Sequence, residues 1–413
     1  MRGSKILVIT YHFAPQLHAS VFRQLQFLRH FRDHGLNAVI LTNAVSATAQ
    51  NKTPHPPERY AEFPVFRVDA TSSTKWKLPN RFKNFLSLRG FSREAQAFGD
   101  VDINWLQMAY HKAIELIAEY HCDTIYIVAP PFSILLLGYR LKRRTHCKLI
   151  IDLQKLLPTQ ENPVLATQRD LIEQRIWQSC DALVVTSWST WTHYSQKMEK
   201  EKVFLVFNSY DTIFNFKTDS YLTNKVFTIF YMGTWDKQRS PDKLLNVLQR
   251  CPFPWRLLSI GSTNHILNEQ ALKYHVHEHV VCVPSLSKEE LLPYLQQADL
   301  LFLTRELPPP PHLDPHIATK VFNYLATGKP IVAQIPLGDT YDFLQKYALQ
   351  VDLIPPHDSE QLYESLSHYY QQWQAGHLSP QTNLEFLQQF DSKTTTRRLS
   401  AVFQMVKQQG QVE

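Results

Sequence analysis

Short runs of Val, Ile and Leu alternate along this chain with longer segments in which apolar residues recur every three or four positions. Runs that are apolar throughout are typical of parallel strands buried on both faces, and the longer segments have the period of helices. We therefore expect an α/β protein with parallel sheets. The first series of expected strands is 5–10, 38–43, 124–129, 148–153, 182–187 and 203–208, and the helices expected in it are 20–34, 104–120, 132–144, 167–178 and 189–198.

The pattern restarts after a polar stretch at 209–225, which we expect to be a linker. A chain of 413 residues is long for one hydrophobic core, so two series of strands predict two Rossmann-like domains, at 1–208 and 226–390, followed by a helical segment at 391–413. Ligands of open parallel sheets bind at the carboxyl ends of the strands, and we expect a site in a cleft between two facing sheets. The second series of expected strands is 227–233, 255–261, 279–284, 299–304 and 330–335.

Composition favours a soluble globular protein, since 44% of the residues are hydrophobic and 19% are charged. We find no apolar run of bilayer-spanning length and no signal peptide in MRGSKILVIT. The formal charge of +6 permits nucleotides, lipid headgroups or nucleic acid as partners and selects none of them. Scattered cysteines favour reduced thiols in a cytoplasmic compartment; they are Cys122, Cys147, Cys180, Cys251 and Cys282.

Several segments, in order along nearly the whole chain, resemble glycosyltransferases of the GT-B fold, most closely the family 4-like group. They are ILVITYHFAPQLHASVFRQLQFLRHFRDHGLNAVILT (6–42), DINW (102–105), DTIYIVAPPFSILLLGYRLKRRTHCKLIIDLQ (123–154), YMGTWDKQRSPDKLL (231–245) and TKVFNYLATGKPIV (319–332). The last resembles the family's TK-(L/V)-FEYLA-x-GKP signature, and the last two are fairly specific together. The final helix, about 392–407, resembles the one that crosses back to the N-terminal domain in this fold.

The resemblance implies an acceptor-binding N-terminal domain and a nucleotide-sugar-binding C-terminal domain. It also implies transfer of a sugar from a nucleotide-diphosphate donor to an acceptor, with retention at the anomeric carbon. No cofactor and no metal is then required, and the nucleotide sugar is a co-substrate. The expected acceptor is a polysaccharide, a glycolipid, another lipid-linked glycan or a small molecule, and nucleic acid is not an expected partner.

A transferase of this kind must stabilise the diphosphate as it leaves, which cations and helix N-termini do well. Gly233 and Thr234 end the first strand of the second series, and Lys237 and Arg239 follow it. By resemblance Lys237 and Arg239 contact the diphosphate and are catalytic. The alternative is that they are solvated charges in a loop.

A second anion site is expected where HIATK (316–320) begins a helix, because the first N–H groups of a helix lack intrahelical partners. Lys320 lies in that first turn, where a cation opposes the helix dipole and therefore favours a nearby anion. We expect Lys320 to be catalytic, the alternative being a lysine that points to solvent. The resemblance implies a donor-binding set of Gly233, Thr234, Gly261, Pro284, His316, Ile317, Ala318, Thr319 and Asn323.

Asn323 stands where the family usually has a glutamate that accepts hydrogen bonds from the ribose hydroxyls, and Pro315 stands at the family's partner acid. An amide oxygen still accepts such a bond, but a neutral bond is weaker than a charge-assisted one. The alternative is that Asn323 is an exposed helix residue. In HLDPH, His312, Asp314 and His316 lack the helical spacing of metal ligands, and we expect His316 to contact sugar or phosphate instead.

The loop after the first strand carries Gln16–Ala19 where the family often has a glycine pair, so it must present side chains. We expect His12, His18 and Arg23 to bind the acceptor; a general base among them is an open alternative, as are satisfied or solvated histidines. Gln154 and Lys155 replace an arginine and an aspartate of the family pattern at the end of another strand. We place both in the acceptor site, where the changed charge alters the pocket.

The segment 75–93, KWKLPNRFKNFLSLRGFSR, combines six basic and four aromatic residues with no acid. This composition suits peripheral binding to anionic lipid on the inner membrane face, where a lipid-linked acceptor resides. The alternatives are nucleic-acid binding and an ordinary basic surface loop.

The leading hypothesis is a cytoplasmic, metal-independent GT-B glycosyltransferase. The second is a degenerate relative that binds a nucleotide, glycan or partner without turnover, and it is motivated by the missing acids and glycines. A third is an epimerase-type enzyme on the same fold.

Overall fold

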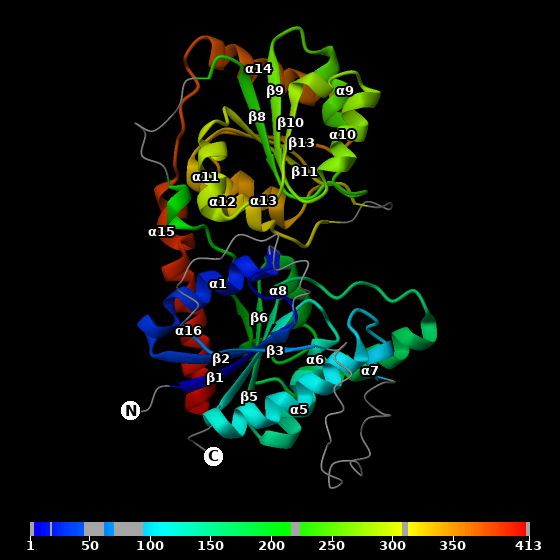
Figure 1. The fold of residues 1–413 in the computed structure, drawn as a ribbon, viewed down its shortest axis with the longest axis vertical. Coiled ribbons are helices and arrows are strands. Elements are labelled where there is room, and N and C mark those ends of the chain that lie inside the picture. Colours follow the sequence, from blue (N-terminus) through cyan, green and yellow to red (C-terminus); the bar gives the residue numbers. More distant parts are fainter. Residues whose placement is uncertain are drawn as a thin grey trace. The chain divides into compact units, whose positions relative to one another are not determined.

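A computed structural model describes residues 4–16, 19–44, 62–69, 94–215, 224–307 and 313–409. The chain forms two compact units, the first from residues 1–207 and 395–413 and the second from residues 208–394. Figure 1 traces the elements of each unit along the chain.

The first unit is built on a seven-stranded parallel sheet with the strand order β3-β2-β1-β4-β5-β6-β7. The strands are β1 (Ser4–Thr10), β2 (Leu36–Asn43), β3 (Val65–Val68), β4 (Thr124–Ala129), β5 (Lys148–Leu153), β6 (Ala182–Val185) and β7 (Val203–Leu205). The helices are α1 (Ala19–Phe31), α5 (Ile103–Tyr120), α6 (Ile134–Thr145), α7 (Pro163–Ser179), α8 (Trp188–Ser195) and α16 (Ser392–Gln409), with short 3₁₀ turns at Arg32–His34 and Lys200–Lys202.

Helices cover both faces of this sheet, as its continuous apolar strands require (Figure 1). Successive residues of β1 point to opposite faces. Leu7 and Ile9 belong to the core that includes Trp105 of α5. Ile6 and Val8 belong to a second core that contains residues of α1 and Phe403 of α16. The C-terminal helix is therefore a core element of the first unit.

The second unit is built on a six-stranded parallel sheet with the order β10-β9-β8-β11-β12-β13. The strands are β8 (Phe227–Met232), β9 (Trp255–Ile260), β10 (Val280–Val283), β11 (Leu300–Thr304), β12 (Ile331–Gln334) and β13 (Val351–Ile354). The helices are α9 (Asp242–Arg250), α10 (Asn264–Lys273), α11 (Lys288–Gln296), α12 (Thr319–Thr327), α13 (Asp339–Tyr347), α14 (Ser359–Gln374) and α15 (Leu384–Phe390), with 3₁₀ turns at Thr212–Phe214 and His277–His279.

Alternate side chains of β8 pack on opposite faces of this second sheet. Phe227, Ile229 and Tyr231 of β8 pack in one core with residues of α9, α10 and α14. Phe230, on the opposite face, packs edge-on against Tyr324 of α12, with ring centroids 6.3 Å apart. This contact packs α12 against β8.

The predicted α/β class with two parallel sheets is confirmed, and every strand expected from sequence is present. β3 and β13 were not expected. Both are four-residue edge strands carrying a charged residue, VFRV and VDLI, and neither is an apolar run. All five cysteines are free thiols. No helix in the described ranges is both long and apolar enough to cross a bilayer.

Candidate functional site

Two glycines let the backbone of the second unit close tightly around one lysine. Gly233 follows β8 with φ of +138°, and a Cβ added there would lie 2.7 Å from Nζ of Lys320. Gly261 follows β9, and a Cβ there would lie 2.0 Å from the carbonyl oxygen of Gly233. Neither position accommodates a side chain without displacing its neighbour. The ends of β8 and β9 and the start of α12 therefore meet at one point.

The side chain of Lys320 packs against a pair of stacked aromatic rings. Tyr231 and Trp235 stack with centroids 3.7 Å apart, and Nζ of Lys320 lies 4.0 Å from the centroid of the Tyr231 ring. The Tyr231 hydroxyl donates to the carbonyl of Thr234 at 2.9 Å, and the Trp235 indole N–H donates to Oγ of Ser259 at 2.9 Å. Each ring is thus fixed by its own hydrogen bond.

A tight turn after β8 carries Arg239. The Arg239 side chain donates to Oδ2 of Asp236 through Nε, at 3.1 Å, and through Nη2, while the Arg239 amide donates to Oδ1 at 2.9 Å. Burial acts to raise the pKa of Asp236, but the bonds and charge of Arg239 outweigh it and the pKa is lowered. The carboxylate therefore stays ionised and holds the guanidinium in place. Nη1 of Arg239 takes no part in these bonds.

Among the described residues, none forms an ion pair or a hydrogen bond with the side-chain amine of Lys320. Its Nζ is buried, and no described residue offers it a hydrogen-bond partner. Burial lowers the pKa of Lys320 well below its usual range, the charge of Arg239 lowers it further, and Asp236 only partly opposes this. A buried amine without a partner is costly, so this geometry favours an anionic ligand.

Asn323 lies one helical turn beyond Lys320 and also has a buried polar side-chain atom. Its side chain is half-buried, and its Oδ1 is buried without a hydrogen-bond partner in the part of the chain that the structure describes. The neighbouring Tyr324 hydroxyl, by contrast, accepts from the amide of Met232 at 3.0 Å and donates to the carbonyl of Phe302 at 3.4 Å. Asn323 is thus not the exposed helix residue that was the alternative interpretation.

The segment before α12 is held in place from outside the helix. Ala318 precedes the helix without a side-chain cap, and its amide donates to Oγ1 of Thr340 at 3.3 Å. The Thr340 hydroxyl donates in turn to the carbonyl of His316. Ile317 is buried, and Oγ1 of Thr319 accepts a 3.5 Å bond from Asn208. The first turn of α12 therefore offers backbone N–H groups to a ligand without a competing cap.

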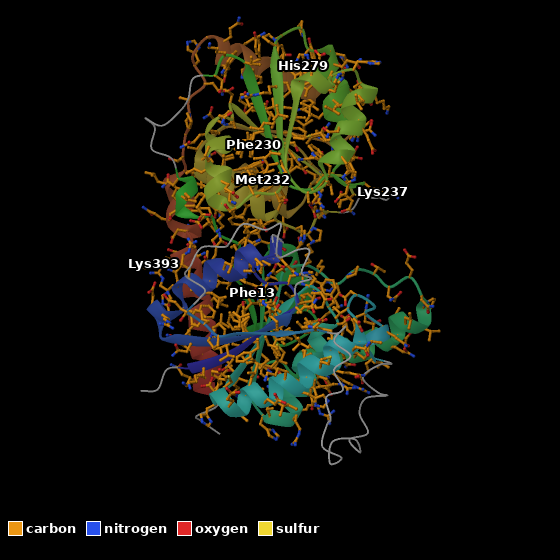
Figure 2. All side chains as sticks on the ribbon, in the orientation of Figure 1. Phe13, Phe230, Met232, Lys237, His279 and Lys393 are labelled. Carbon is orange, nitrogen blue, oxygen red and sulfur yellow. The ribbon has the colours of Figure 1, made fainter. Side chains whose placement is uncertain are left out.

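The remaining predicted donor residues lie in segments that follow strand ends or precede α12. Lys237 is exposed in the turn beyond Met232, which ends β8; both are labelled in Figure 2. Pro284 is exposed directly after β10. His316 is half-buried before α12.

The HLDPH segment is described only in part. His312 lies outside the described residues, and Oδ2 of Asp314 pairs with Nε of Arg305 at 2.8 Å. Within the described ranges, no three His, Cys, Asp or Glu side chains converge in a way that could hold a metal ion.

In the first unit, the structure contradicts an acceptor contact for Arg23. Its guanidinium is 1% exposed and binds both carboxylate oxygens of Asp152, at 3.0 and 3.1 Å, together with the carbonyls of Val206 and Phe207 at 2.9 Å. Arg23 points inward because Asp152, on β5, is a buried charge that needs a partner. The sequence reading missed this because the pair is 129 positions apart in the chain.

The other predicted acceptor residues lie where β1 and β5 end. His12 follows β1 and its Nδ1 is 3.1 Å from Oε1 of Gln16, whereas His18 lies outside the described residues. After β5, Lys155 is exposed, and Gln154 has a buried Nε2 with no hydrogen-bond partner among the described residues. The described residues therefore leave the Gln154 amide available to donate to a ligand.

One further polar residue at this edge was not predicted. Gln24 of α1 is 3% exposed; its Nε2 donates to Oγ1 of Thr10 at 2.9 Å, and its Oε1 has no hydrogen-bond partner in the described ranges. A glutamine in an amphipathic helix gives no sequence signal of such a position. The basic and aromatic segment 75–93 lies outside the described residues.

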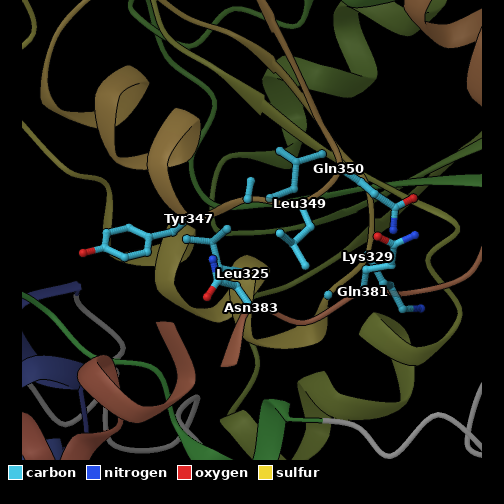
Figure 3. A pocket seen from close by; sticks show the side chains of 10 residues that line it. Leu325, Lys329, Tyr347, Leu349, Gln350, Gln381 and Asn383 are labelled. Atoms are coloured by element: carbon cyan, nitrogen blue, oxygen red, sulfur yellow. The ribbon is translucent and has the colours of Figure 1, made fainter. Parts of the chain in front are cut away.

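A small pocket in the second unit lies away from these groups. Leu325, Gly328 and Lys329, at the C-terminal end of α12, line it together with Tyr347 and residues near Gln381 (Figure 3). Its volume of about 10 Å³ is room for one water molecule. Lys320 and Asn323 are not among its lining residues, so this pocket is not the site described above.

Comparison of the sequence with family models and with curated proteins finds no match. Solved structures do match. Anabaena HepE in complex with UDP-glucose has a TM-score of 0.70 and 14% identity, over 97% of this chain and 99% of that chain. Sucrose-phosphate synthase from Thermosynechococcus elongatus has a TM-score of 0.65 and 15% identity, over 99% of this chain and 98% of that chain. The lipopolysaccharide galactosyltransferase WaaB has a TM-score of 0.59 and 11% identity, over 97% of this chain and 99% of that one. These likenesses establish that the chain has the GT-B fold.

Proposed function

We propose that this protein is a glycosyltransferase that uses a nucleotide-diphosphate sugar as donor and binds it in the second unit. The observation that carries the proposal is a pair of buried polar atoms on α12, Nζ of Lys320 and Oδ1 of Asn323, for which the described residues provide no hydrogen-bond partner. Nζ of Lys320 can donate to an anion, and Oδ1 of Asn323 can accept from a hydroxyl. A diphosphate joined to a ribose offers both of these groups. The similar structures with UDP and with UDP-glucose support this choice of ligand.

In this proposal, Arg239 and Lys320 stabilise the negative charge that grows on the diphosphate as the anomeric C–O bond breaks. The first turn of α12 adds backbone N–H groups and the positive end of its dipole. Gly233 and Gly261 act by allowing the backbone to approach, since a side chain at either would displace Lys320 or the neighbouring loop. The reaction needs no metal in this scheme, because these groups carry the charge, and it proceeds with retention as the resemblance implies.

The acceptor is proposed to be a polysaccharide, a glycolipid or a small molecule that reaches the carboxyl edge of the first sheet. Gln154 and Gln24 support a hydroxyl-bearing acceptor, because the described residues leave the Gln154 N–H donor and the Gln24 carbonyl acceptor without a hydrogen-bond partner. We place the protein in the cytoplasm, or peripherally on the inner membrane face.

The competing candidate is a GT-B protein that binds a nucleotide sugar without turnover, favoured by the neutral Asn323 in place of an acid. A thermal-shift screen with UDP-, GDP- and ADP-sugars, followed by assay of hydrolysis and transfer, separates the two. Stabilisation accompanied by release of a nucleoside diphosphate is the expected result. Stabilisation without release, even with acceptors added, would establish the binding protein, and no stabilisation by any nucleotide would reject both.

A further inference from the structure

The side-chain amine of Lys320 lies in surroundings that do not favour a positive charge. Its amine is buried, has no hydrogen-bond partner among the described residues, and lies 4.0 Å above the centre of the Tyr231 ring. The face of an aromatic ring attracts a cation, but it recovers less free energy than an ammonium group loses on leaving water. A neutral amine can also rest on a ring by donating an N–H to its π face.

The charges around Lys320 do not neutralise it. Asp236 is committed to Arg239 by two side-chain bonds, so the pair presents the lysine with a nearby cation as well as an anion. On α12 itself the sequence is TKVFNYLAT, so Lys320 is the one charged residue of the helix and Asn323 replaces the acid that could have paired with it.

The charged groups at the end of β11 are engaged elsewhere. Arg305 pairs with Asp314 at 2.8 Å, and Glu306 pairs with Lys243 at 2.9 Å. The other titratable groups near the start of α12 are His316, which precedes the helix, and the phenols of Tyr231 and Tyr324. Burial is the main cause that raises the pKa of both tyrosines, so neither supplies an anion near neutral pH.

We propose that Lys320 is held as a neutral amine against the Tyr231 ring in the free protein, and that a nucleoside diphosphate binds there together with one proton taken from solvent. The proposal rests on the proposed donor site. The proton adds to the Nζ lone pair to give an ammonium group, and the negative charge of the diphosphate supplies the counter-ion that the described residues do not. Tyr231 is then a positioning residue that keeps the amine at the site before the ligand arrives.

Proton uptake can be measured directly by titration calorimetry of the wild-type protein with UDP, GDP and ADP at about pH 8. Repeating each titration in buffers of different ionisation enthalpy gives the number of protons bound per nucleotide. The terminal phosphate is already ionised at this pH, so it does not account for uptake. We expect about one proton per nucleotide bound. We also expect Kd to weaken by about tenfold per pH unit over the range in which free Lys320 is neutral.

Two variants identify the group that takes the proton. Lys320→Arg carries a permanent charge and should bind the nucleotide with no proton uptake. Lys320→Met should bind more weakly, also without uptake. Uptake that persists in Lys320→Arg would place the proton on another group and overturn the proposal.

The wild-type measurement decides the question even if a variant does not fold. Nucleotide binding with no proton uptake overturns the role of Lys320 and leaves the proposed function standing. Failure of all three nucleotides to bind rejects the proposed donor site itself. The two failures are therefore distinguishable.

Discussion

Arg23 and Asp152 form a two-point ion pair in the interior of the first unit, with Nε 3.0 Å from Oδ2 and Nη2 3.1 Å from Oδ1. The Tyr126 hydroxyl donates to Oδ2 as well, at 3.0 Å. Arg23 also binds the carbonyls of Val206 and Phe207, the last two residues before the chain leaves this unit. One arginine thus ties α1, β5 and the end of the segment after β7 together.

Replacing Arg23 by Met should destabilise the protein strongly. The change leaves the buried Asp152 carboxylate without its cation and two carbonyls without donors, at a cost of about 3–5 kcal/mol of unfolding free energy. Arg32→Met is the matched control, because Arg32 pairs with Glu62 at 3.1 Å where both side chains are about half exposed. An exposed pair of this kind contributes about 1 kcal/mol or less. Urea unfolding measures both, and equal losses would contradict the structural role of Arg23.

Gly261→Ala should disrupt the site through sterics. The new Cβ would lie 2.0 Å from the backbone oxygen of Gly233, which has no flexible end that could move away. We expect a loss of several kcal/mol and a change in the near-ultraviolet circular dichroism of the Tyr231–Trp235 stack. Gly376→Ala is the control. The added Cβ would meet no atom of the described residues within 4 Å, so only the positive φ of +70° destabilises the folded state, by about 1–2 kcal/mol. A Gly261→Ala protein as stable as Gly376→Ala would show that the β8 and β9 ends do not need this approach.

Most strands could be predicted from the sequence because a strand that is buried on both faces consists of a continuous apolar run. TIYIVA and KLIIDL match β4 and β5 residue for residue. The edge strands β3 and β13 were not predicted, because partly exposed positions interrupt the apolar run. Arg67 of β3 is exposed, and Asp352 of β13 is half-buried. Local pattern therefore identified the strands that are apolar runs, including the edge strands β7 and β10, and left out two four-residue edge strands that carry an exposed or half-buried charged residue.

The candidate site was only partly predictable. The positions of Lys320 and Asn323 followed from the resemblance and from helix termini, but their burial without partners did not. Tyr231, which supports Lys320, looks in the sequence like any apolar residue of a strand. Arg23 was misassigned because its partner lies on a distant strand. Contacts between elements far apart in the chain decide which polar residues are free, and a linear pattern does not contain them.

Arg239→Ala should lower turnover far more than a matched surface change. Under the proposed function, the variant removes a cation from the leaving diphosphate, and loss of one such group typically costs about 10²–10³ in kcat. Arg250→Ala is the control, because Arg250 also pairs with a carboxylate, Glu360 at 2.8 Å, but lies in the last turn of α9. Steady-state rates with the donor found in the screen provide the measurement. Comparable losses in both variants would reject the assignment of Arg239.

Asn323→Glu should tighten binding of a nucleotide that carries ribose hydroxyls. A hydrogen bond to a charged acceptor contributes about 1.5–3 kcal/mol against about 0.5–1.5 kcal/mol for a neutral one, so we expect Kd to fall by about tenfold. The 2′,3′-dideoxy nucleotide is the control, since it has no hydroxyl to donate. An equal gain for both nucleotides would mean that the new carboxylate acts elsewhere, for example as a counter-ion to Lys320.

Lys329 should make the stability of the protein rise with pH. Its buried Nζ donates to the carbonyls of Gln296, at 2.8 Å, and Ala298, and burial lowers its pKa to about 7, with Asp299 partly opposing the shift. The unfolded chain has the ordinary lysine pKa of about 10.4. Between these two values the unfolded state binds more protons, so the unfolding free energy increases by up to about 1.4 kcal/mol per pH unit.

The difference between the wild type and Lys329→Met isolates this contribution. Methionine removes the titrating group and two hydrogen bonds; the lost bonds add a constant offset, whereas the lost titration removes the slope. Urea unfolding at several values between about pH 7 and pH 9.5 should therefore show the two free energies diverging as pH rises. Lys273→Met, at a residue whose side chain is 61% exposed, should follow the wild type instead. Parallel profiles for wild type and Lys329→Met would mean that Lys329 keeps its proton in the folded state, stabilised by the two carbonyls and by Asp299 more strongly than burial opposes it.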